Sequence, residues 1–261
     1  MDLSLIFITA LIVTGAIILL HKILTVFGRS DRLSGEAPKM PRIVEYSRSF
    51  FPIILIVFIL RSFVVEPFRI PSGSMLPNLH IGDFILVNKY TYGIRLPISH
   101  TKVAGEGSPK RGDVMVFRYP VDPKLNFIKR VIGLPGDKLS YVDKRLAING
   151  VVVSTEADGM FDSQENTGHA YPLDQFVEMI GDEHHRVITD RFRNSRNLEQ
   201  VIVPEGHYFV MGDNRDHSND SRYWRFVPED HIVGRAFVIL FNWKGIDNGW
   251  VEWSRIGNSI E

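Results

Sequence analysis

The sequence predicts a mainly β protein of 261 residues that is anchored by two N-terminal transmembrane helices. Three observations lead to this prediction. Two long apolar runs stand near the N-terminus, residues 66–261 break into short β-rich runs divided by turns, and Asn149-Gly150 is a strong hairpin signal. Apolar residues make up 44% of the chain, which is high for a soluble protein.

Composition excludes several classes of protein. Lys and Arg together number 30, as do Asp and Glu, so no net basic charge favours a nucleic-acid partner. Because the chain has no cysteine, it can form no disulfide, no Cys-based zinc site and no thiol nucleophile. We expect neither a metal nor an organic cofactor.

Residues 1–65 are predicted to form a membrane anchor. Leu3–Leu20 carries no charge over 18 residues, and a helix over about 3–24 is long enough to cross the ~30 Å hydrocarbon core. A cleaved signal peptide is the alternative, but Asp2 and the lack of a cation before the apolar run disfavour it.

A second span is predicted at about 50–65. Its uncharged part is short, so Arg61 would snorkel or the helix would tilt, and a buried core helix is the alternative. A loop at about 25–49 separates the two spans, and residues 21–49 carry six cations against three acids. Short basic loops stay in the cytoplasm, so residues 66–261 are expected outside it.

The remaining chain is predicted to form a β-rich catalytic domain over residues 66–261. A helical period is seen only at Leu173–Ile180, and residues 154–200 are polar enough to be an insert with small hairpins of its own. The expected strands lie at residues 83–87, 113–119, 127–132, 146–148, 151–153, 207–211 and 232–241.

A turn with two serines follows the second apolar run. In residues 70–77, Ser72 and Ser74 flank a glycine between two prolines, which favours a sharply bent backbone. Such a turn can expose a serine Oγ beside unpaired backbone N–H groups, which would serve as a nucleophile and an oxyanion hole. A polar connector after a membrane anchor is the alternative.

Lys129 is the candidate base. Strand alternation places Phe127, Lys129 and Val131 on one face and Arg130 on the other, so one of the two adjacent cations would point into an apolar environment. Lysine can lose its proton on burial, whereas arginine stays charged. The pKa of a buried lysine falls by up to ~3–5 units, and the alternative is an edge-strand lysine that blocks aggregation.

A third polar stretch covers residues 211–224, where Asp–Arg pairs would fix a loop. A calcium loop on Asp213, Asp216 and Asp220 is an alternative, but the EF-hand spacing and closing Glu are missing. A His-based triad through His217 is another, although the chain has no G-x-S-x-G elbow.

The order of these motifs carries a resemblance to a known family. The stretches are Pro71–Pro77, Ile81–Asp83, Lys110–Asp113, Lys129–Asp137, and Gly212–Asp216 continuing through Ser221–Trp224. Together they resemble bacterial type I signal peptidase, also called leader peptidase, which is a Ser-Lys protease. The sequence departs from that family at Phe127, where Tyr is frequent, at His80, which replaces an apolar residue, and throughout residues 154–200.

The resemblance implies a role for each matching residue. Ser74 would be the nucleophile and Lys129 the general base. The Ser74 N–H and the Ser72 hydroxyl would hold the oxyanion, and Ser218 would hydrogen-bond the Lys129 amine. The loop would be supported by two ion pairs, Asp220 with Arg222 and Asp213 with Arg215. Small-residue pockets, matching an Ala-x-Ala preference, would be lined by Phe68, Ile70, Met75, Phe127 and Ile128.

The expected function is therefore that of a membrane-bound serine endopeptidase that removes signal peptides from exported preproteins. It would act as a monomer in the bacterial cytoplasmic (inner) membrane, touching the lipid bilayer, with its catalytic domain on the periplasmic or extracytoplasmic side. Trp250 and Trp253 would lie at headgroup level or pack within the domain. Two alternatives are a self-cleaving SOS repressor, which needs a DNA-binding domain, and a membrane-tethered β domain that only binds.

Overall fold

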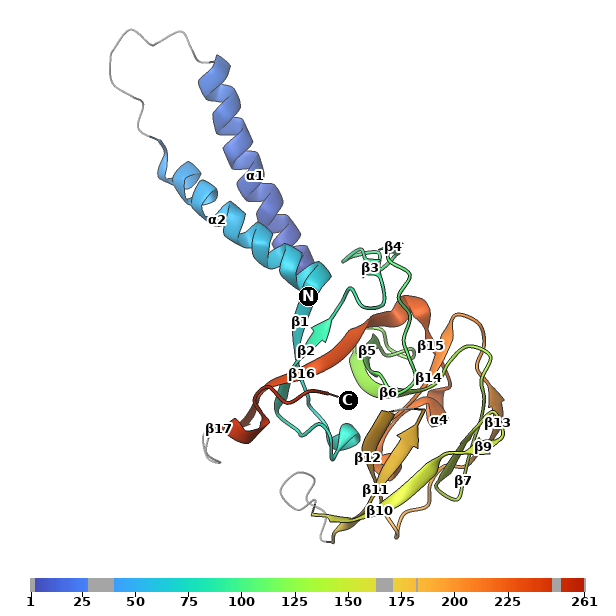
Figure 1. Ribbon diagram of the computed structural model, residues 1–261. Coiled ribbons are helices and arrows are strands. Elements are labelled where there is room, and N and C mark those ends of the chain that lie inside the picture. Colours follow the sequence, from blue (N-terminus) through green and yellow to red (C-terminus); the bar gives the residue numbers. More distant parts are fainter. Residues whose placement is uncertain (1–2, 28–39, 163–170, 182, 246–249, 261) are drawn as a thin grey trace. The chain divides into compact units, whose positions relative to one another are not determined.

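The structure is a computed structural model that describes residues 3–27, 40–162, 171–181, 183–245 and 250–260. The chain divides into two compact units. One comprises Met1–Val64 with Leu96–Ser99, and the other comprises Val65–Arg95 with His100–Glu261. The predicted mainly β fold with two apolar helices at the N-terminus is confirmed (Figure 1).

The first unit contains α1 (Leu3–Phe27) and α2 (Arg42–Ile59), which a π-helical turn at Leu60–Val64 extends. Both segments are long and apolar enough to cross a membrane. The second helix begins earlier than the predicted residue 50, because Pro41 precedes its first turn and an acid stands within that turn. Within the predicted loop at about 25–49, residues 42–49 belong to α2, and residues 28–39 lie outside the described part of the chain.

The second unit is built on an eight-stranded antiparallel sheet that curls around its core (Figure 1). Its strand order is β1 (Val65–Arg69), β2 (Asp83–Asn88), β16 (Ile232–Gly245), β5 (Val114–Arg118), β6 (Asn126–Gly133), β14 (His207–Met211) and β15 (Val227–Pro228), with β17 (Trp250–Glu252) alongside β16.

Three smaller sheets complete this unit. They are the pair β3 (Ile94–Arg95) and β4 (Lys102–Ala104), the sheet of β13 (Leu198–Ile202), β7 (Lys138–Val142), β8 (Arg145–Ile148) and β9 (Val151–Val152), and the sheet of β10 (Ser154–Phe161), β11 (Leu173–Ile180) and β12 (Glu183–Thr189). The hairpin predicted at Asn149-Gly150 joins β8 to β9, and both residues have the positive φ that a tight hairpin turn requires.

The helical period at Leu173–Ile180 was a wrong indication, because this segment is the strand β11. It pairs antiparallel with β10 on one side and β12 on the other. Hydrogen bonding to two neighbours outweighs a local spacing that also suits a helix. The predicted hairpins of the polar insert are therefore one three-stranded sheet, called the insert sheet below.

Apolar side chains cover both faces of the central strands. Along β5, Val114 and Val116 pack into one cluster, whereas Met115 and Phe117 pack into another on the opposite face. A strand buried on both sides has no alternating pattern of exposure. This double burial is what allows β6, the neighbour of β5, to carry charged side chains that are shielded from water.

We predict that Phe209→Ala lowers the free energy of unfolding by about 3–5 kcal/mol, because Phe209 is fully buried in the cluster of β14, β6 and β7 and its loss leaves a cavity. Urea unfolding of the detergent-solubilised protein measures this change. The matched control is Val152→Ala, whose side chain is 61% exposed and which we expect to change stability by about 0.5 kcal/mol or less. Equal effects of the two substitutions would contradict the assigned core.

Candidate active site

The turn with Ser74 follows β1 directly. The Ile70 N–H donates to the Asp83 carbonyl at 2.8 Å and so fastens the end of β1 to β2. Ser72 is extended, and a 3₁₀ turn at Gly73–Met75 carries Ser74, which is 8% exposed. The bend comes from this 3₁₀ geometry, because Gly73 does not adopt the positive φ that its sequence context allowed for.

Lys129 lies on β6, opposite Met115 of β5, and its side chain is buried. Its Nζ donates to Ser74 Oγ at 2.7 Å and to the Ile128 carbonyl at 2.8 Å. The ring of Phe127 lies 5.5 Å from the same amine, on the face that strand alternation assigned to it. Ser74 of the turn and Lys129 of the strand are 55 positions apart in the sequence, and their side chains meet in one buried contact.

Burial controls the charge of this amine. Removal from water lowers the pKa of Lys129 from 10.5 to about 8, while the nearby carboxylates of Asp220 and Asp213 act in the opposite direction. With a pKa of about 8, about one amine in ten is neutral at pH 7, against about one in 2,500 for an ordinary lysine. The site thus holds a lysine that can accept a proton near neutral pH.

The neighbouring cation is also buried, but it lies against a carboxylate and not in an apolar environment. Arg130 is fully buried and forms two 2.8 Å contacts with Asp213, through Nε and Nη2, while its Nη1 donates to the Gly112 carbonyl at 2.8 Å. The predicted Asp213–Arg215 pair is therefore wrong. Arg215 instead binds Glu178 of β11 through two contacts, whereas Arg130 binds both oxygens of Asp213.

The predicted Asp220–Arg222 pair is present. The Arg222 Nε and Nη2 groups each donate to an Asp220 oxygen at 2.8 Å, at the start of α4 (Ser221–Trp224). Asp220 also accepts the Gly212 N–H at 3.0 Å, and Arg222 donates to the Arg215 carbonyl. These contacts close residues 212–222 into a loop, called the acidic loop below.

Ser218 does not make its predicted hydrogen bond to the Lys129 amine. Its Oγ is buried and has no hydrogen-bond partner among the described residues. The side chain lies against Gly212 instead, where an added Cβ would be 2.3 Å from Ser218 Oγ and 2.4 Å from the Ser74 carbonyl oxygen. Only glycine at position 212 lets the acidic loop approach the Ser74 turn this closely.

Four of the five predicted pocket residues gather in one apolar cluster. Ile70, Met75 and Ile128 belong to its buried part, and Phe68 packs against it. Phe127 lies in a different cluster, where its ring stacks on Tyr119 with centroids 4.2 Å apart. Ile70 and Met75 are 2% and 0% exposed, so in this structure they support the surface beside Ser74 from beneath.

The carboxylates considered for calcium are each bound to a cation: Asp213 to Arg130, Asp216 to Lys144 and Asp220 to Arg222. In the chain as described, no group of three His, Asp or Glu side chains could hold a metal ion. His217 contacts Asp190 at 2.9 Å and Arg193 at 3.0 Å, so its ring is engaged away from Ser74.

Sequence reasoning missed several residues that hold this site. Glu178 and Asp190 come from the insert sheet and its end, and Asn78 bridges the two regions by donating to the Arg186 carbonyl and to Asp213, each at 2.7 Å. The one available signal was Glu178 itself, an acid in a run that ends on apolar Met179 and Ile180. Its partner lies 37 positions away, and no local pattern identifies such a partner.

We predict that the Lys129 amine titrates near pH 8 in the folded protein, because burial disfavours its charged form. NMR of the protein with isotope-labelled lysine side chains measures the midpoint, and Lys129→Met identifies the signal. A midpoint near the ordinary value of 10.5 would contradict the burial of this group.

Comparisons with known proteins agree on one family. The profile described as signal peptidase, peptidase S26, matches residues 43–243. Signal peptidase I of Pseudomonas aeruginosa is 50% identical over 217 residues, and that of Pseudomonas fluorescens is 52% identical over 217 residues; in both cases the match covers 78% of this chain and 75% of the relative.

A solved signal peptidase I from Enterococcus faecalis V583 is 30% identical and covers 49% of this chain and 96% of its own. Its TM-score is 0.31. The chain belongs to the peptidase S26 family of signal peptidases.

Proposed function

We propose that the protein is a Ser-Lys endopeptidase that removes signal peptides from exported preproteins after a small residue, at a site of the Ala-x-Ala type. The observation that carries this proposal is the 2.7 Å contact between the Lys129 amine and the Ser74 hydroxyl, with both side chains buried. A general base must lie within hydrogen-bond reach of the proton that it takes, and this pair meets that requirement.

In the proposed reaction, neutral Lys129 accepts the Ser74 proton as Oγ attacks the carbonyl carbon of the scissile peptide bond. The resulting ammonium then gives its proton to the leaving amine, the C–N bond breaks and an ester to Ser74 remains. Lys129 next takes a proton from water as the water oxygen attacks the ester carbonyl carbon. The ammonium returns that proton to Ser74 Oγ as the ester C–O bond breaks, which frees the new carboxyl terminus and restores the serine hydroxyl and the neutral lysine.

The developing oxyanion is assigned to the Ser74 N–H and the Ser72 hydroxyl. Ser72 is exposed, and its Oγ lies 3.4 Å from Ser74 Oγ, so it stands on the open side of the turn. The apolar cluster that includes Phe68, Ile70 and Ile128 also includes Met75, the residue directly after Ser74. We assign the small-residue preference to that cluster, because its buried side chains leave little room for a large substrate side chain.

The membrane-tethered domain that only binds is the competing function. It requires no contact between Ser74 and Lys129, contrary to their 2.7 Å separation. We further propose that the catalytic unit lies on the extracytoplasmic side, because six cations against three acids in residues 21–49 favour a cytoplasmic loop. All the groups of the proposed site come from a single chain, so we propose that a monomer is active.

We predict that Ser74→Ala and Lys129→Ala each abolish cleavage of a preprotein by the detergent-solubilised enzyme, because they remove the nucleophile and the base. Ser72→Ala should lower the rate about 10²–10³-fold, the usual effect of losing one oxyanion donor. Gel analysis of preprotein and mature protein over time measures these rates. Near wild-type cleavage by Lys129→Arg would sink the proposal, because arginine cannot give up its proton.

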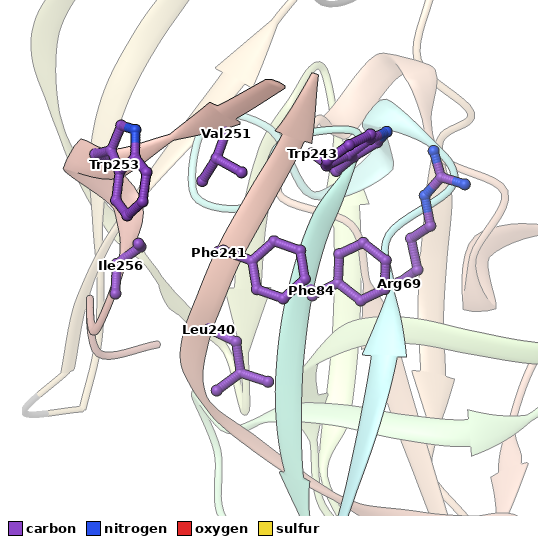
Figure 2. A pocket seen from close by; sticks show the side chains of 8 residues that line it. All are labelled: Arg69, Phe84, Leu240, Phe241, Trp243, Val251, Trp253 and Ile256. Carbon is purple, nitrogen blue, oxygen red and sulfur yellow. The ribbon is translucent and has the colours of Figure 1, made fainter. Parts of the chain in front are cut away.

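The same unit carries an apolar groove that we assign to contact with the lipid bilayer. Figure 2 shows its lining side chains on β1, β2, β16, β17 and the segment after β17. The groove has a volume of about 650 Å³, and its lining is apolar apart from one guanidinium. The residues that line it are Arg69, Phe84, Leu240, Phe241, Trp243, Val251, Trp253 and Ile256.

Exposure in this region supports the assignment. Trp253 is 77% exposed and Trp250 is 57% exposed, with Trp250 set against the Trp243 ring at a centroid distance of 5.8 Å. Indole rings favour the headgroup level of a bilayer, where one edge is apolar and the other is wet. A basic side chain at the rim, Arg69, fits the phosphate groups at the same depth.

We predict that the Trp250→Ala/Trp253→Ala double variant of residues 66–261 binds phospholipid vesicles at least about tenfold more weakly than the unaltered fragment, a loss of about 1.4 kcal/mol. Co-sedimentation with vesicles measures binding. Phe192→Ala is the matched control, since Phe192 is 73% exposed and lies outside the groove. Equal binding by all three proteins would remove the lipid assignment.

A further inference from the structure

The insert sheet is fastened to the acidic loop by backbone contacts. The Ile188 N–H of β12 donates to the Asp213 carbonyl at 3.0 Å, and Ile188 forms a parallel bridge with Asn214. The next link reaches the candidate nucleophile, because the Asn214 N–H donates to the Ser74 carbonyl at 3.1 Å. A short series of hydrogen bonds therefore runs from the insert sheet to the Ser74 turn.

A buried ion pair lies beside this series. Glu178 of β11 is 2% exposed, and its two carboxylate oxygens accept hydrogen bonds from Nη1 and Nη2 of Arg215, the first at 2.7 Å. The other close neighbour of Glu178 is His185 of β12, whose Nε2 lies 3.2 Å from the carboxylate, and burial lowers the pKa of this imidazole. Burial, the largest single influence, raises the pKa of Glu178, but the charge of Arg215 and the hydrogen bonds from His185 and Arg215 together outweigh it and lower that pKa to about 2.

We propose that Glu178 is a positioning residue for the Ser74–Lys129 site, which it serves by holding Arg215 and thereby the acidic loop. This inference rests on the function proposed above. Glu178 touches neither Ser74 nor Lys129 by any contact described here, so it acts through the loop. One residue of the polar insert, Glu178, thus positions the site from a distance, although the sequence indicated no chemistry in this segment.

The acidic loop affects the pKa of Lys129 because it carries two carboxylates close to the amine. Asp213 and Asp220 both raise the pKa of Lys129. Arg215 belongs to the same loop, and its carbonyl accepts a hydrogen bond from Arg222, which in turn binds Asp220. The position of Arg215 is thus coupled to the positions of both carboxylates.

Loss of the Glu178 charge would leave the Arg215 guanidinium buried and charged without its partner. Asp213 is a carboxylate whose charge already acts on Arg215, so it is the group that a freed Arg215 would attract. Movement of Asp213 toward Arg215 takes negative charge away from Lys129. The pKa of Lys129 would then fall below its value of about 8.

The test is Glu178→Gln in the full chain, assayed by preprotein cleavage from pH 5 to 10. We expect kcat to fall about 10–100-fold, in line with the cost of an ångström-scale misplacement. KM should be unchanged, because Glu178 lies outside the apolar cluster beside Ser74. The acid limb of the kcat/KM profile should move to lower pH. Glu156→Gln, an exposed acid on β10, is the matched control and should match the wild type.

A purely structural role gives a different result. Partial unfolding scales the whole pH profile down and leaves its acid limb in place, and that outcome would overturn the proposal. If Glu178→Gln does not fold, the double variant Glu178→Gln/Arg215→Gln replaces it, since it leaves no unpaired buried ion. For this variant we expect a reduced kcat with the acid limb at its wild-type position and a urea-unfolding midpoint equal to that of the wild type, so that partial unfolding does not account for the loss. A wild-type kcat, or a fall in kcat that only matches a loss of folded protein, would overturn the proposal.

The failure of this inference is distinguishable from the failure of the proposed function. If wild-type protein cleaves, Ser74→Ala does not, and Glu178→Gln matches the wild type in rate and pH profile, only the positioning role is lost. If wild-type protein shows the same cleavage as Ser74→Ala, the proposed Ser-Lys function is lost and the positioning role with it.

Discussion

The arrangement around Ser74 depends on keeping one amine out of water. Lys129 is 4% exposed, and its burial is the largest influence on its pKa. Two carboxylates, Asp213 and Asp220, stand close enough to oppose that influence, and unpaired they would hold the proton on the amine. Each carboxylate instead accepts two hydrogen bonds from one arginine, whose positive charge compensates the negative charge of the carboxylate. Burial therefore remains dominant, and the amine can be neutral near physiological pH.

These compensating arginines also join distant parts of the chain. Arg130 comes from the centre of the main sheet, directly after Lys129, and ties β6 to the acidic loop. Arg222 lies in α4 and ties the end of that loop to its beginning through Asp220 and Gly212. Arg215 connects the loop to the insert sheet. The loop is thus held by three arginine side chains, each of which is 2% exposed or less.

Local sequence patterns were sufficient for the fold class and for most strands. Asn149 and Gly150 form the predicted hairpin turn. Both residues adopt the positive φ that this turn requires, and Asn and Gly adopt positive φ more readily than other residues. Leu173–Ile180 shows where such patterns fail, because pairing with two strands decides its structure. Local patterns also fail to predict ion pairs, for a related reason. Asp213 pairs with Arg130, 83 positions away, and sequence proximity alone favours nearer arginines. No single motif was sufficient to predict the candidate site. The prediction depended on several motifs that occur in a particular order along the chain.

Buried ion pairs of this kind contribute less to stability than their contacts imply, because dehydration of both charges offsets most of their attraction. Their effect on geometry is larger. A guanidinium bound to a carboxylate by two parallel hydrogen bonds has a fixed plane and a fixed direction of approach. In the acidic loop, three such contacts orient a segment that packs through Gly212 directly against the Ser74 carbonyl. Burying this ion-pair network costs free energy, but the network fixes the orientation of the loop. The Ser74–Lys129 site needs such a fixed orientation, because the two side chains must stay within hydrogen-bond distance in a place that water does not reach.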